Sequence, residues 1–224
     1  MELLLSPLFS GSSGNAVYVG AGRTGILVDA GVSCARVVTE MKATGIDPAA
    51  LSAILITHEH SDHVAGAGIL SRKFDLPIYA TEGTWNAMAE KLGAVNAKNI
   101  RVIESGQDFY IGDLDISPFP LPHDAADPCG YAFTCGRLRA AIATDIGCLR
   151  EGWLKAVSGC ELVLLESNYD PGMLKAGRYP YALKTRILGT KGHLSNEDAG
   201  RAACRLEKSG VRSLILGHLS RENN

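Results

Sequence analysis

The sequence predicts an α/β protein of the four-layer αββα kind, in which two β-sheets pack face to face and helices cover both outer faces. Three observations favour this fold. The chain has 224 residues, the length of one large domain. Its β-type segments come in two groups, and helical segments follow each group. Because neither a short-period repeat nor a linker divides the chain, we expect one domain over residues 1–224.

The first group fills the N-terminal half. Short apolar and β-branched runs predict strands at 3–8, 16–19, 25–29, 53–56 and 77–80. Apolar periodicity predicts helices at 35–44, 66–74 and 84–92. In the first of these helices Val37, Val38 and Met41 share one side, and Gly45 ends it.

The second group begins after Ala94. Strands are predicted near 101–103, 109–111, 114–118, 130–135 and 139–143, and later at 162–165 and 213–216. A helix is predicted at 152–157 and another at 195–209, where Ser195 and Asp198 form a capping box. We expect the stretch 171–192 to be irregular.

Composition excludes several classes of protein. Apolar residues make up 46% and charged residues 21%, which excludes a disordered chain. The net charge of −2 provides no overall basic field, so a nucleic-acid site requires a local patch. No apolar run reaches the ~18–20 residues of a membrane span. The six cysteines are scattered and no export signal precedes them, so we expect reduced thiols and a cytosolic, cytoplasmic location.

A dense cluster of possible metal ligands follows the predicted strand 53–56. The segment 57–63 reads Thr-His-Glu-His-Ser-Asp-His, and a loop after a rigid strand can direct its side chains toward one point. In such a loop His58 and His60 can reach one ion while Asp62 and His63 reach a neighbouring ion. Imidazole and carboxylate ligands suit Zn²⁺, and also Mn²⁺ or Fe²⁺.

Three later strand ends each carry one more ligand type. His123, Asp145 and His218 follow the predicted strands 114–118, 139–143 and 213–216. Any one of them alone is more often an ordinary core or surface residue. Together with the cluster they predict a dinuclear metal site assembled from distant segments of the chain.

The spacing of these residues resembles the metallo-β-lactamase superfamily over nearly the whole chain. The resemblance implies a metallo-β-lactamase sandwich with two divalent ions. It assigns the ligands as follows: His58, His60 and His123 bind one ion; Asp62, His63 and His218 bind the second; and Asp145 bridges them. Asp29 matches the acid that supports the site by accepting a proton from a ligating imidazole. The alternative for Asp29 is an ordinary acid in the turn after a strand.

Two neighbouring ions predict a hydrolase. A hydroxide can form between them at neutral pH, because bound metal lowers the pKa of water toward ~7. Asp62 and Asp145 can accept the proton of the water. This chemistry alone does not choose between phosphodiester, lactone, thioester and β-lactam substrates.

The segment 192–199 favours a phosphodiester. It resembles the ribonuclease Z segment in which a histidine precedes a helix and donates a proton to the leaving oxygen. His193 matches that histidine, and Glu166 matches the acid that orients it. The alternative for His193 is a surface residue at the start of a helix.

Two further segments are candidates for substrate binding. The stretch 171–192 contains basic residues and two tyrosines but no Asp or Glu, so it is a candidate track for a phosphate backbone. The loop 10–15 offers hydroxyl and backbone N–H groups to a phosphate. The candidate residues are Ser12, Ser13, Asn15, Arg178, Tyr181, Lys184 and Arg186. An ordinary solvated loop and a plain hairpin turn are the alternatives.

Within the superfamily, the chain resembles the YycJ/WalJ-like branch, which is related to ribonuclease Z and ribonuclease J. The matching segments are 9–15, 28–31, 57–63, 192–196 and 216–220. The resemblance implies a cytosolic bacterial nuclease that degrades DNA as a 5′→3′ exonuclease. Relatives continue past the residue that matches His218 into a strand and a helix, so we expect this domain to lack those two elements. The rivals are a small-molecule hydrolase of the glyoxalase II or lactonase type and a non-catalytic binding protein on the same fold.

Overall fold

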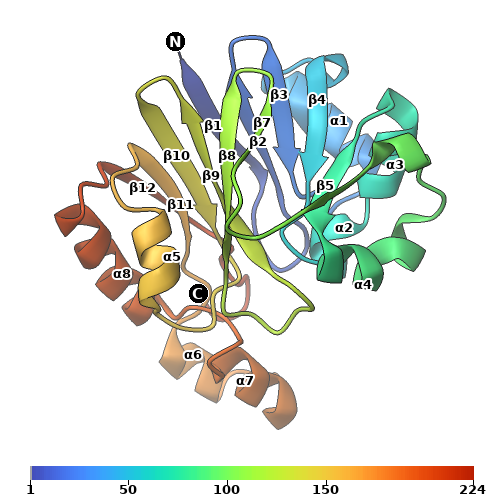
Figure 1. The fold of residues 1–224 in the computed structure, drawn as a ribbon. Coiled ribbons are helices and arrows are strands. Elements are labelled where there is room, and N and C mark those ends of the chain that lie inside the picture. Colours follow the sequence, from blue (N-terminus) through green and yellow to red (C-terminus); the bar gives the residue numbers. More distant parts are fainter. Residues whose placement is uncertain (1) are drawn as a thin grey trace.

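The computed structural model describes residues 2–224 as two six-stranded β-sheets packed face to face, with helices on both outer faces (Figure 1). Met1, the first residue of the predicted domain, lies outside the described residues. The predicted four-layer αββα architecture is therefore confirmed.

The first sheet holds the N-terminal strands in sequence order. They are β1 (Leu3–Phe9), β2 (Ala16–Ala21), β3 (Thr24–Val28), β4 (Leu51–Leu55), β5 (Ile78–Thr81) and β6 (Ile100–Ile103). The first three strands pair antiparallel, whereas β3 to β6 pair parallel. Parallel neighbours need crossover connections. These include the helices α1 (Cys34–Ala43), α2 (Ser61–Val64), α3 (Ala67–Phe74) and α4 (Glu82–Leu92).

The second sheet has the order β12-β11-β10-β9-β8-β7. Its strands are β7 (Phe109–Ile111), β8 (Leu114–Pro120), β9 (Cys129–Cys135), β10 (Leu138–Ala143), β11 (Leu162–Glu166) and β12 (Ser213–Gly217). Strands β7 to β10 pair antiparallel, and β10 to β12 pair parallel. The helices α5 (Glu151–Ala156) and α8 (Asn196–Lys208) cover the outer face of this sheet (Figure 1).

Alternation along β3 shows how the layers are separated. Ile26 and Val28 point into the core between the two sheets, and Leu27 points into the core under the helices of the first sheet. All three side chains are fully buried. Because successive side chains of a strand face opposite sides, one short apolar strand supplies both cores. The strands are thereby held rigidly, and their ends are fixed points for the loops that follow.

The prediction that 171–192 is irregular is wrong. This stretch contains α6 (Pro171–Ala176) and α7 (Tyr181–Leu188), which lie across the end of the sandwich (Figure 1). Asp170 caps α6 by accepting a hydrogen bond from the backbone N–H of Met173 at 2.7 Å, and Pro171 occupies its first turn. Such an acid-proline pair is a helix-start signal.

The predicted cap of α8 is confirmed, because the Asp198 backbone N–H donates to Ser195 Oγ at 3.1 Å. At the edge of the second sheet, β12 leaves Leu216 52% exposed. The expectation that a further strand and helix belong beyond this edge stays a prediction. Among residues 2–224, none of the helices combines the length and the apolar character needed to span a bilayer.

Candidate metal centre

The predicted ligands meet at one end of the sandwich. His58 lies beyond the end of β4, Asp145 beyond β10 and His218 directly after β12. Ring nitrogens and carboxylate oxygens form groups whose atoms lie within 4.8 Å of one another. The groups are His58, His60 and His123; His58, His63 and Asp145; Asp62, His63 and His218; and Asp145, Glu166, His193 and His218. Segments far apart in the sequence thus supply one cluster.

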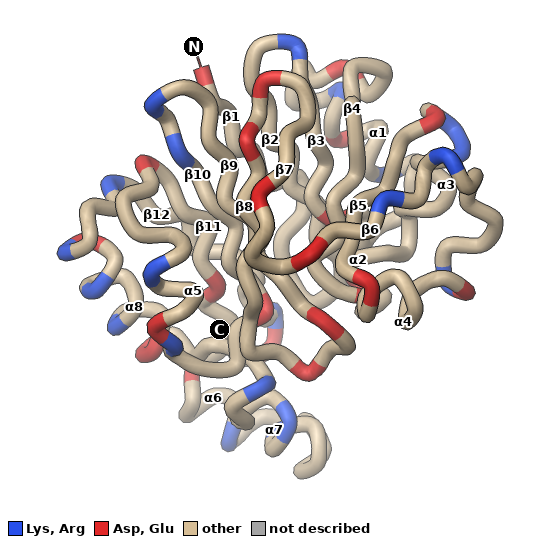
Figure 2. Tube along the Cα trace, viewed as in Figure 1, with Lys and Arg blue, Asp and Glu red and all other residues tan. Residues whose placement is uncertain are grey.

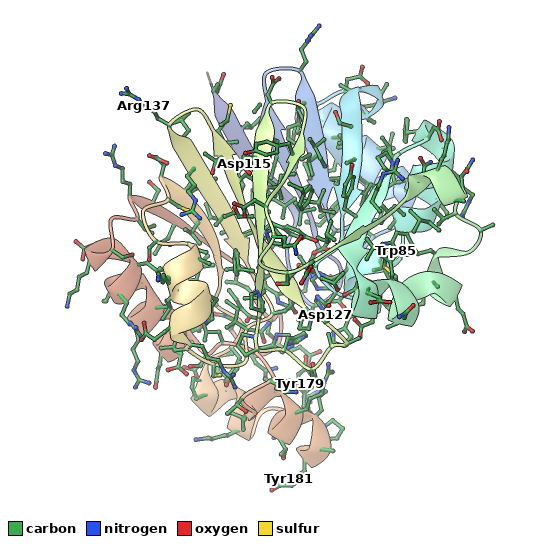
Figure 3. The ribbon with its side chains drawn as sticks, viewed as in Figure 1. Trp85, Asp115, Asp127, Arg137, Tyr179 and Tyr181 are labelled. Carbon is green, nitrogen blue, oxygen red and sulfur yellow. The ribbon has the colours of Figure 1, made fainter. Side chains whose placement is uncertain are left out.

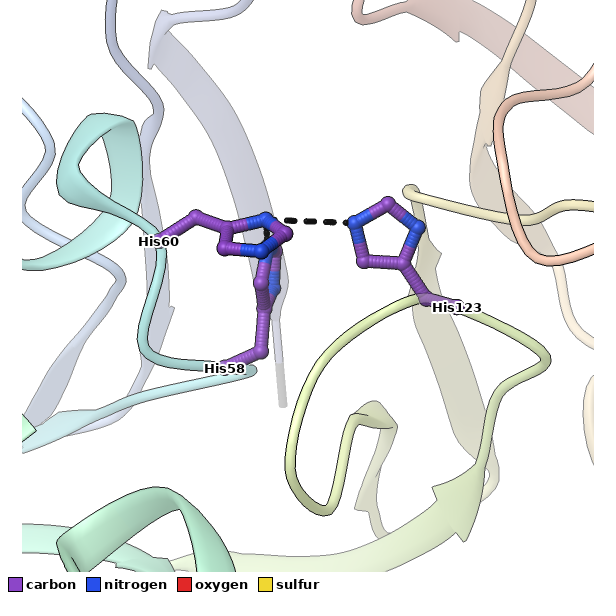
Figure 4. A group of neighbouring side chains, drawn as sticks. All are labelled: His58, His60 and His123. Atoms are coloured by element: carbon purple, nitrogen blue, oxygen red, sulfur yellow. Dashed lines mark hydrogen bonds between the residues drawn. The ribbon is translucent and has the colours of Figure 1, made fainter. Parts of the chain in front are cut away.

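Three imidazoles form the first group (Figure 4). His58 and His60 project from the loop after β4, and His123 projects toward them from a loop of the second sheet. His60 Nδ1 lies 3.0 Å from His58 Nε2 and 3.3 Å from His123 Nε2. Two nitrogens that each lie about 2.0–2.1 Å from a tetrahedral Zn²⁺ are about 3.3 Å apart. The spacing of the three nitrogens therefore fits one cation.

The other ring nitrogens of this group have partners of their own. His123 Nδ1 donates to the Gly192 carbonyl oxygen at 2.9 Å, and His58 Nδ1 lies 3.0 Å from Thr57 Oγ1. A hydrogen bond at one ring nitrogen fixes the tautomer and directs the lone pair of the other nitrogen. These contacts direct the Nε2 atoms of His58 and His123 toward His60 Nδ1.

The second group joins Asp62, His63 and His218. Asp62 Oδ2 lies 3.5 Å from His63 Nε2 and 3.9 Å from His218 Nε2. Behind the group, His63 Nδ1 donates to Asp29 Oδ2 at 2.8 Å, and Asp29 also accepts from the backbone N–H and the hydroxyl of Thr57. Asp29 thereby fixes the ring of His63 and the start of the His-rich loop.

Asp145 lies between the two groups. Its Oδ2 is 3.4 Å from His63 Nε2, and its Oδ1 is 3.7 Å from His123 Nε2. Within residues 2–224, Asp145 Oδ2 and His218 Nε2 are buried and have no hydrogen-bond partner. Buried polar atoms without partners are costly, at about 1–3 kcal/mol each and more for a charged group. A cation bound between the two groups would satisfy both atoms, so the residues fit a metal.

Three of these positions have a strained backbone. Asp29, Asp145 and His218 have φ of 60°, 63° and 53°, in the left-handed region. The one other non-glycine residue with positive φ among the described residues is Asp75, which caps the C-terminus of α3. A left-handed residue other than glycine costs about 1–2 kcal/mol. Such strain is found at functional sites, where the surrounding structure holds it in place.

Protonation states also favour a cation. Burial lowers the pKa of His58 well below its usual value and lowers that of His60, so both rings are in the neutral form that binds metal. Burial opposes the charge of Asp145, but the surrounding imidazoles, led by His218 and His63, hold its pKa well below its usual value. For His63, burial is outweighed by Asp145 and Asp29, which raise its pKa well above its usual value. The negative charges of Asp145 and Asp29 that favour a proton on His63 would also attract a metal ion.

Glu166 and His193 form a second functional unit beside the ligands. Glu166 is fully buried at the end of β11, and its Oε1 accepts from His193 Nδ1 at 2.8 Å. Its Oε2 accepts from the backbone N–H groups of Ile146 and Leu194 at 2.6 and 3.1 Å. Burial lowers the pKa of His193, but the charge and hydrogen bond of Glu166 outweigh burial and raise it to about 9. Glu166 therefore favours the protonated form of His193.

These side chains open into a cavity of about 380 Å³, which we call the metal-site cavity. His60, Asp62, Asp145, His193 and His218 line it from the sandwich side. Helix α7 contributes Arg186, and Figure 2 shows the basic positions of this helix below the sandwich. The cavity therefore presents both anionic and cationic groups to a substrate.

The structure brings some of the predicted substrate-binding residues to this cavity but not others. Ser12 and Arg186 line it, whereas Arg178, Tyr181 and Lys184 do not. Tyr181 is 84% exposed and lies at the outer side of α7, whereas Tyr179 lies between α7 and the sandwich and lines the cavity (Figure 3). The sequence alone did not indicate which tyrosine faces inward.

Ser13 and Asn15 occupy different surroundings in the loop between β1 and β2. Ser13 is exposed, outside the metal-site cavity. Asn15 is buried, and its Nδ2 lies 3.4 Å from Asp62 Oδ2 and 3.0 Å from His63 Nε2. Its contacts hold the loop against the helix that carries Asp62.

Sequence reasoning missed two residues that shape the site. Asp124 forms a two-pronged ion pair with Arg186, and its Oδ1 lies 3.4 Å from His123 Nε2. Asn168 lines the metal-site cavity, and its Nδ2 donates to the His218 carbonyl oxygen at 2.6 Å. The position of Asp124 next to His123 was an available signal. No sequence signal pointed to Asn168, because its hydrogen bond to His218 joins residues 50 positions apart.

A donor cluster of this kind at the strand ends of an αββα sandwich defines a metal-dependent hydrolase. The sequence profile described as "Beta-lactamase superfamily domain" matches residues 24–219, and the chain belongs to that superfamily. It is 40% identical over 224 residues to a protein named exodeoxyribonuclease YycJ from Bacillus anthracis, covering 100% of this chain and 85% of the relative. It is also 40% identical over 221 residues to exodeoxyribonuclease WalJ from Streptococcus pneumoniae serotype 2, and the match covers 98% of this chain and 82% of that relative.

Solved structures show the same fold. The Zn²⁺-bound PqqB of Methylobacterium extorquens superposes with a TM-score of 0.78 at 18% identity, covering 98% of this chain and 90% of that one. The short form of human tRNase Z superposes with a TM-score of 0.68 at 18% identity, covering 97% of this chain and 93% of that one. At these identities the likeness concerns the fold alone.

Proposed function

We propose that this protein is a DNA phosphodiesterase with two divalent metal ions, acting as a 5′→3′ exonuclease in the cytoplasm. The pairing of His193 with Glu166 beside the donor cluster carries this proposal. The names of the relatives at 40% identity, both exodeoxyribonucleases, support the choice of DNA. The 5′→3′ direction rests on the family resemblance of the sequence motifs.

The donor set suggests how the ions would be held. His58, His60 and His123 would hold one ion, Asp62, His63 and His218 the other, and Asp145 would contact both. Five imidazoles with two carboxylates suit Zn²⁺, and also Mn²⁺ or Fe²⁺. When bound, the ions would lower the pKa of water and polarise the phosphate oxygens.

His193 would be the general acid. Glu166 holds its Nδ1, so Nε2 remains for the substrate, and the ring lines the metal-site cavity. Because the pKa of His193 is raised to about 9, the ring carries a proton at neutral pH. Transfer of that proton to the departing sugar oxygen would neutralise the alkoxide as the P–O bond breaks, a contribution of about 10²–10⁴-fold in rate.

Asp62 would accept the proton of the attacking water. Its side chain is 28% exposed, so the proton can pass on to solvent. Burial raises the pKa of Asp62, but contacts with His63 outweigh burial and hold the pKa below its usual value. The carboxylate is therefore ionised at neutral pH.

The rival function is hydrolysis of small thioesters or lactones. Arg186 at the metal-site cavity favours a phosphodiester, because its Nε and Nη2 hold Asp124 while its Nη1 remains to donate to a phosphate oxygen. The test is to incubate the Zn²⁺- or Mn²⁺-loaded protein with DNA and RNA labelled at the 5′ or the 3′ end, and in parallel with thioester and lactone panels. Stepwise release of nucleotides from the 5′ end of DNA supports the proposal. Activity confined to thioesters or lactones contradicts it.

A further inference from the structure

A second cavity of about 470 Å³, which we call the flanking cavity, adjoins the metal-site cavity. Ser12, Tyr179 and Ser220 line both cavities, so the two are contiguous. The volume falls within the ~300–1,000 Å³ of small-molecule sites. A substrate that extends from the metal-site cavity past these three residues therefore enters a space large enough for another chemical unit.

Cationic and aromatic side chains line the flanking cavity. Arg36 comes from the first turn of α1, a turn without acidic residues, and Arg221 comes from the segment after β12. Glu222 is the one acid among the described residues that line the cavity. The Arg36 guanidinium lies 4.9 Å from the centre of the Phe9 ring, and Tyr179 supplies a second ring. Guanidinium groups bind phosphates and rings stack on bases, so this lining suits a nucleotide.

The loop between β1 and β2 adds hydrogen-bond donors. The backbone N–H groups and hydroxyls of Ser12 and Ser13 make no hydrogen bond among the described residues. The loop is nevertheless held firmly, because the Gly11 N–H donates to Asn15 Oδ1 at 2.9 Å and a Cβ on Gly14 would lie 2.3 Å from Val32 Cγ1. Successive free N–H groups on a fixed turn are suited to binding an anion.

We propose that the flanking cavity is a nucleotide subsite, which holds the deoxynucleotide next to the phosphodiester cleaved in the metal-site cavity. Its base would contact Phe9 and Tyr179, and its phosphate would contact Arg36, Arg221 and the serine loop. This inference rests on the proposed nuclease function and extends it from the cleaved bond to the neighbouring unit of the strand.

The test compares Arg36→Ala and Arg221→Ala with Arg137→Ala as a matched control. All three arginines are exposed, and Arg137 lies in the β9–β10 turn at the opposite end of the sandwich (Figure 3). The substrates are a single-stranded DNA oligonucleotide and bis(p-nitrophenyl) phosphate, a phosphodiester without a nucleotide. For each flanking-cavity variant we expect the ratio of kcat/KM on DNA to kcat/KM on the small ester to fall about tenfold, mainly through KM. Arg137→Ala should keep the wild-type ratio.

The outcomes separate this inference from the function on which it rests. If the wild type degrades DNA and both variants keep its ratio, the subsite is overturned while the nuclease function stands. An equal loss on both substrates would mean a structural defect and would also overturn the subsite. If the wild type cleaves the small ester but not DNA, the nuclease function fails and the subsite fails with it.

Discussion

Glu166 Oε1 accepts a hydrogen bond from His193 Nδ1 at 2.8 Å, although 27 positions separate the two residues. The same oxygen accepts from His218 Nδ1 at 3.0 Å. One buried carboxylate therefore orients the proposed general acid and a proposed metal ligand together. Proton transfer and metal binding are therefore coupled through Glu166.

Replacing His193 by Ala should remove the proton donor and leave the metal ligands in place. We expect turnover on DNA to fall about 10²–10⁴-fold. The loss on bis(p-nitrophenyl) phosphate should be much smaller, because nitrophenolate leaves without a proton. Steady-state kinetics on both substrates, together with metal analysis, checks this prediction. Equal losses on the two substrates would remove His193 from the role of general acid.

Replacing Glu166 by Ala should destabilise the fold as well as the site. The change leaves the N–H groups of Ile146 and Leu194 buried without an acceptor, at about 1–3 kcal/mol each. Glu166→Gln retains one carbonyl oxygen, so its loss of unfolding free energy should be smaller. Urea unfolding of the two variants and the wild type measures the difference. Equal stabilities of Glu166→Ala and the wild type would contradict the assigned contacts.

Removing bound metal should lower the melting temperature. An ion present at about 100–1,000 times its Kd stabilises a fold by ~2.7–4.1 kcal/mol. For a chain of this size that corresponds to about 5–15 °C. Thermal unfolding with and without a chelator measures this difference in melting temperature. The variant Asp145→Asn lacks one negative charge of the metal centre, so the chelator should lower its melting temperature by less. The same melting temperature in both conditions would argue against a metal held by these residues.

Arg186→Ala should weaken DNA binding more than Lys184→Ala. Arg186 lines the metal-site cavity, whereas Lys184 is half-buried outside it and its Nζ donates to the Lys175 carbonyl oxygen at 2.7 Å. Loss of one phosphate contact reduces the slope of log K against log salt by about one. Binding titrations of a DNA oligonucleotide at several salt concentrations test the pair. An equal or larger effect of Lys184→Ala would place the DNA path along the outside of α7.

Much of the architecture could be predicted because the signals are local. Short β-branched runs predict strands, and the two groups of strands predict two sheets. Strand ends that carry His123, Asp145 and His218 indicated a common site, because each adds a ligand type to the cluster at 57–63. The match to a known spacing then supplied a specific set of ligands.

The remainder depends on tertiary contacts that leave little trace in the sequence. Tyr179 and Tyr181 are two positions apart, and only packing of α7 against the sandwich determines that Tyr179 lines the cavity. The ion pair of Asp124 with Arg186 joins residues 62 positions apart. The start of α6 is different, because Asp170 and Pro171 form a local helix-start signal. The stretch 171–192 shows no clear apolar periodicity, so this signal alone did not lead to a predicted helix.

The most direct measurement is DNA hydrolysis by metal-free protein during titration with Zn²⁺ or Mn²⁺, with bound metal counted in the same samples. We expect no hydrolysis without metal and a rate that rises with bound metal up to two ions per chain. Full activity on DNA in the metal-free protein, or fewer than one bound ion per chain at saturation, would contradict this expectation.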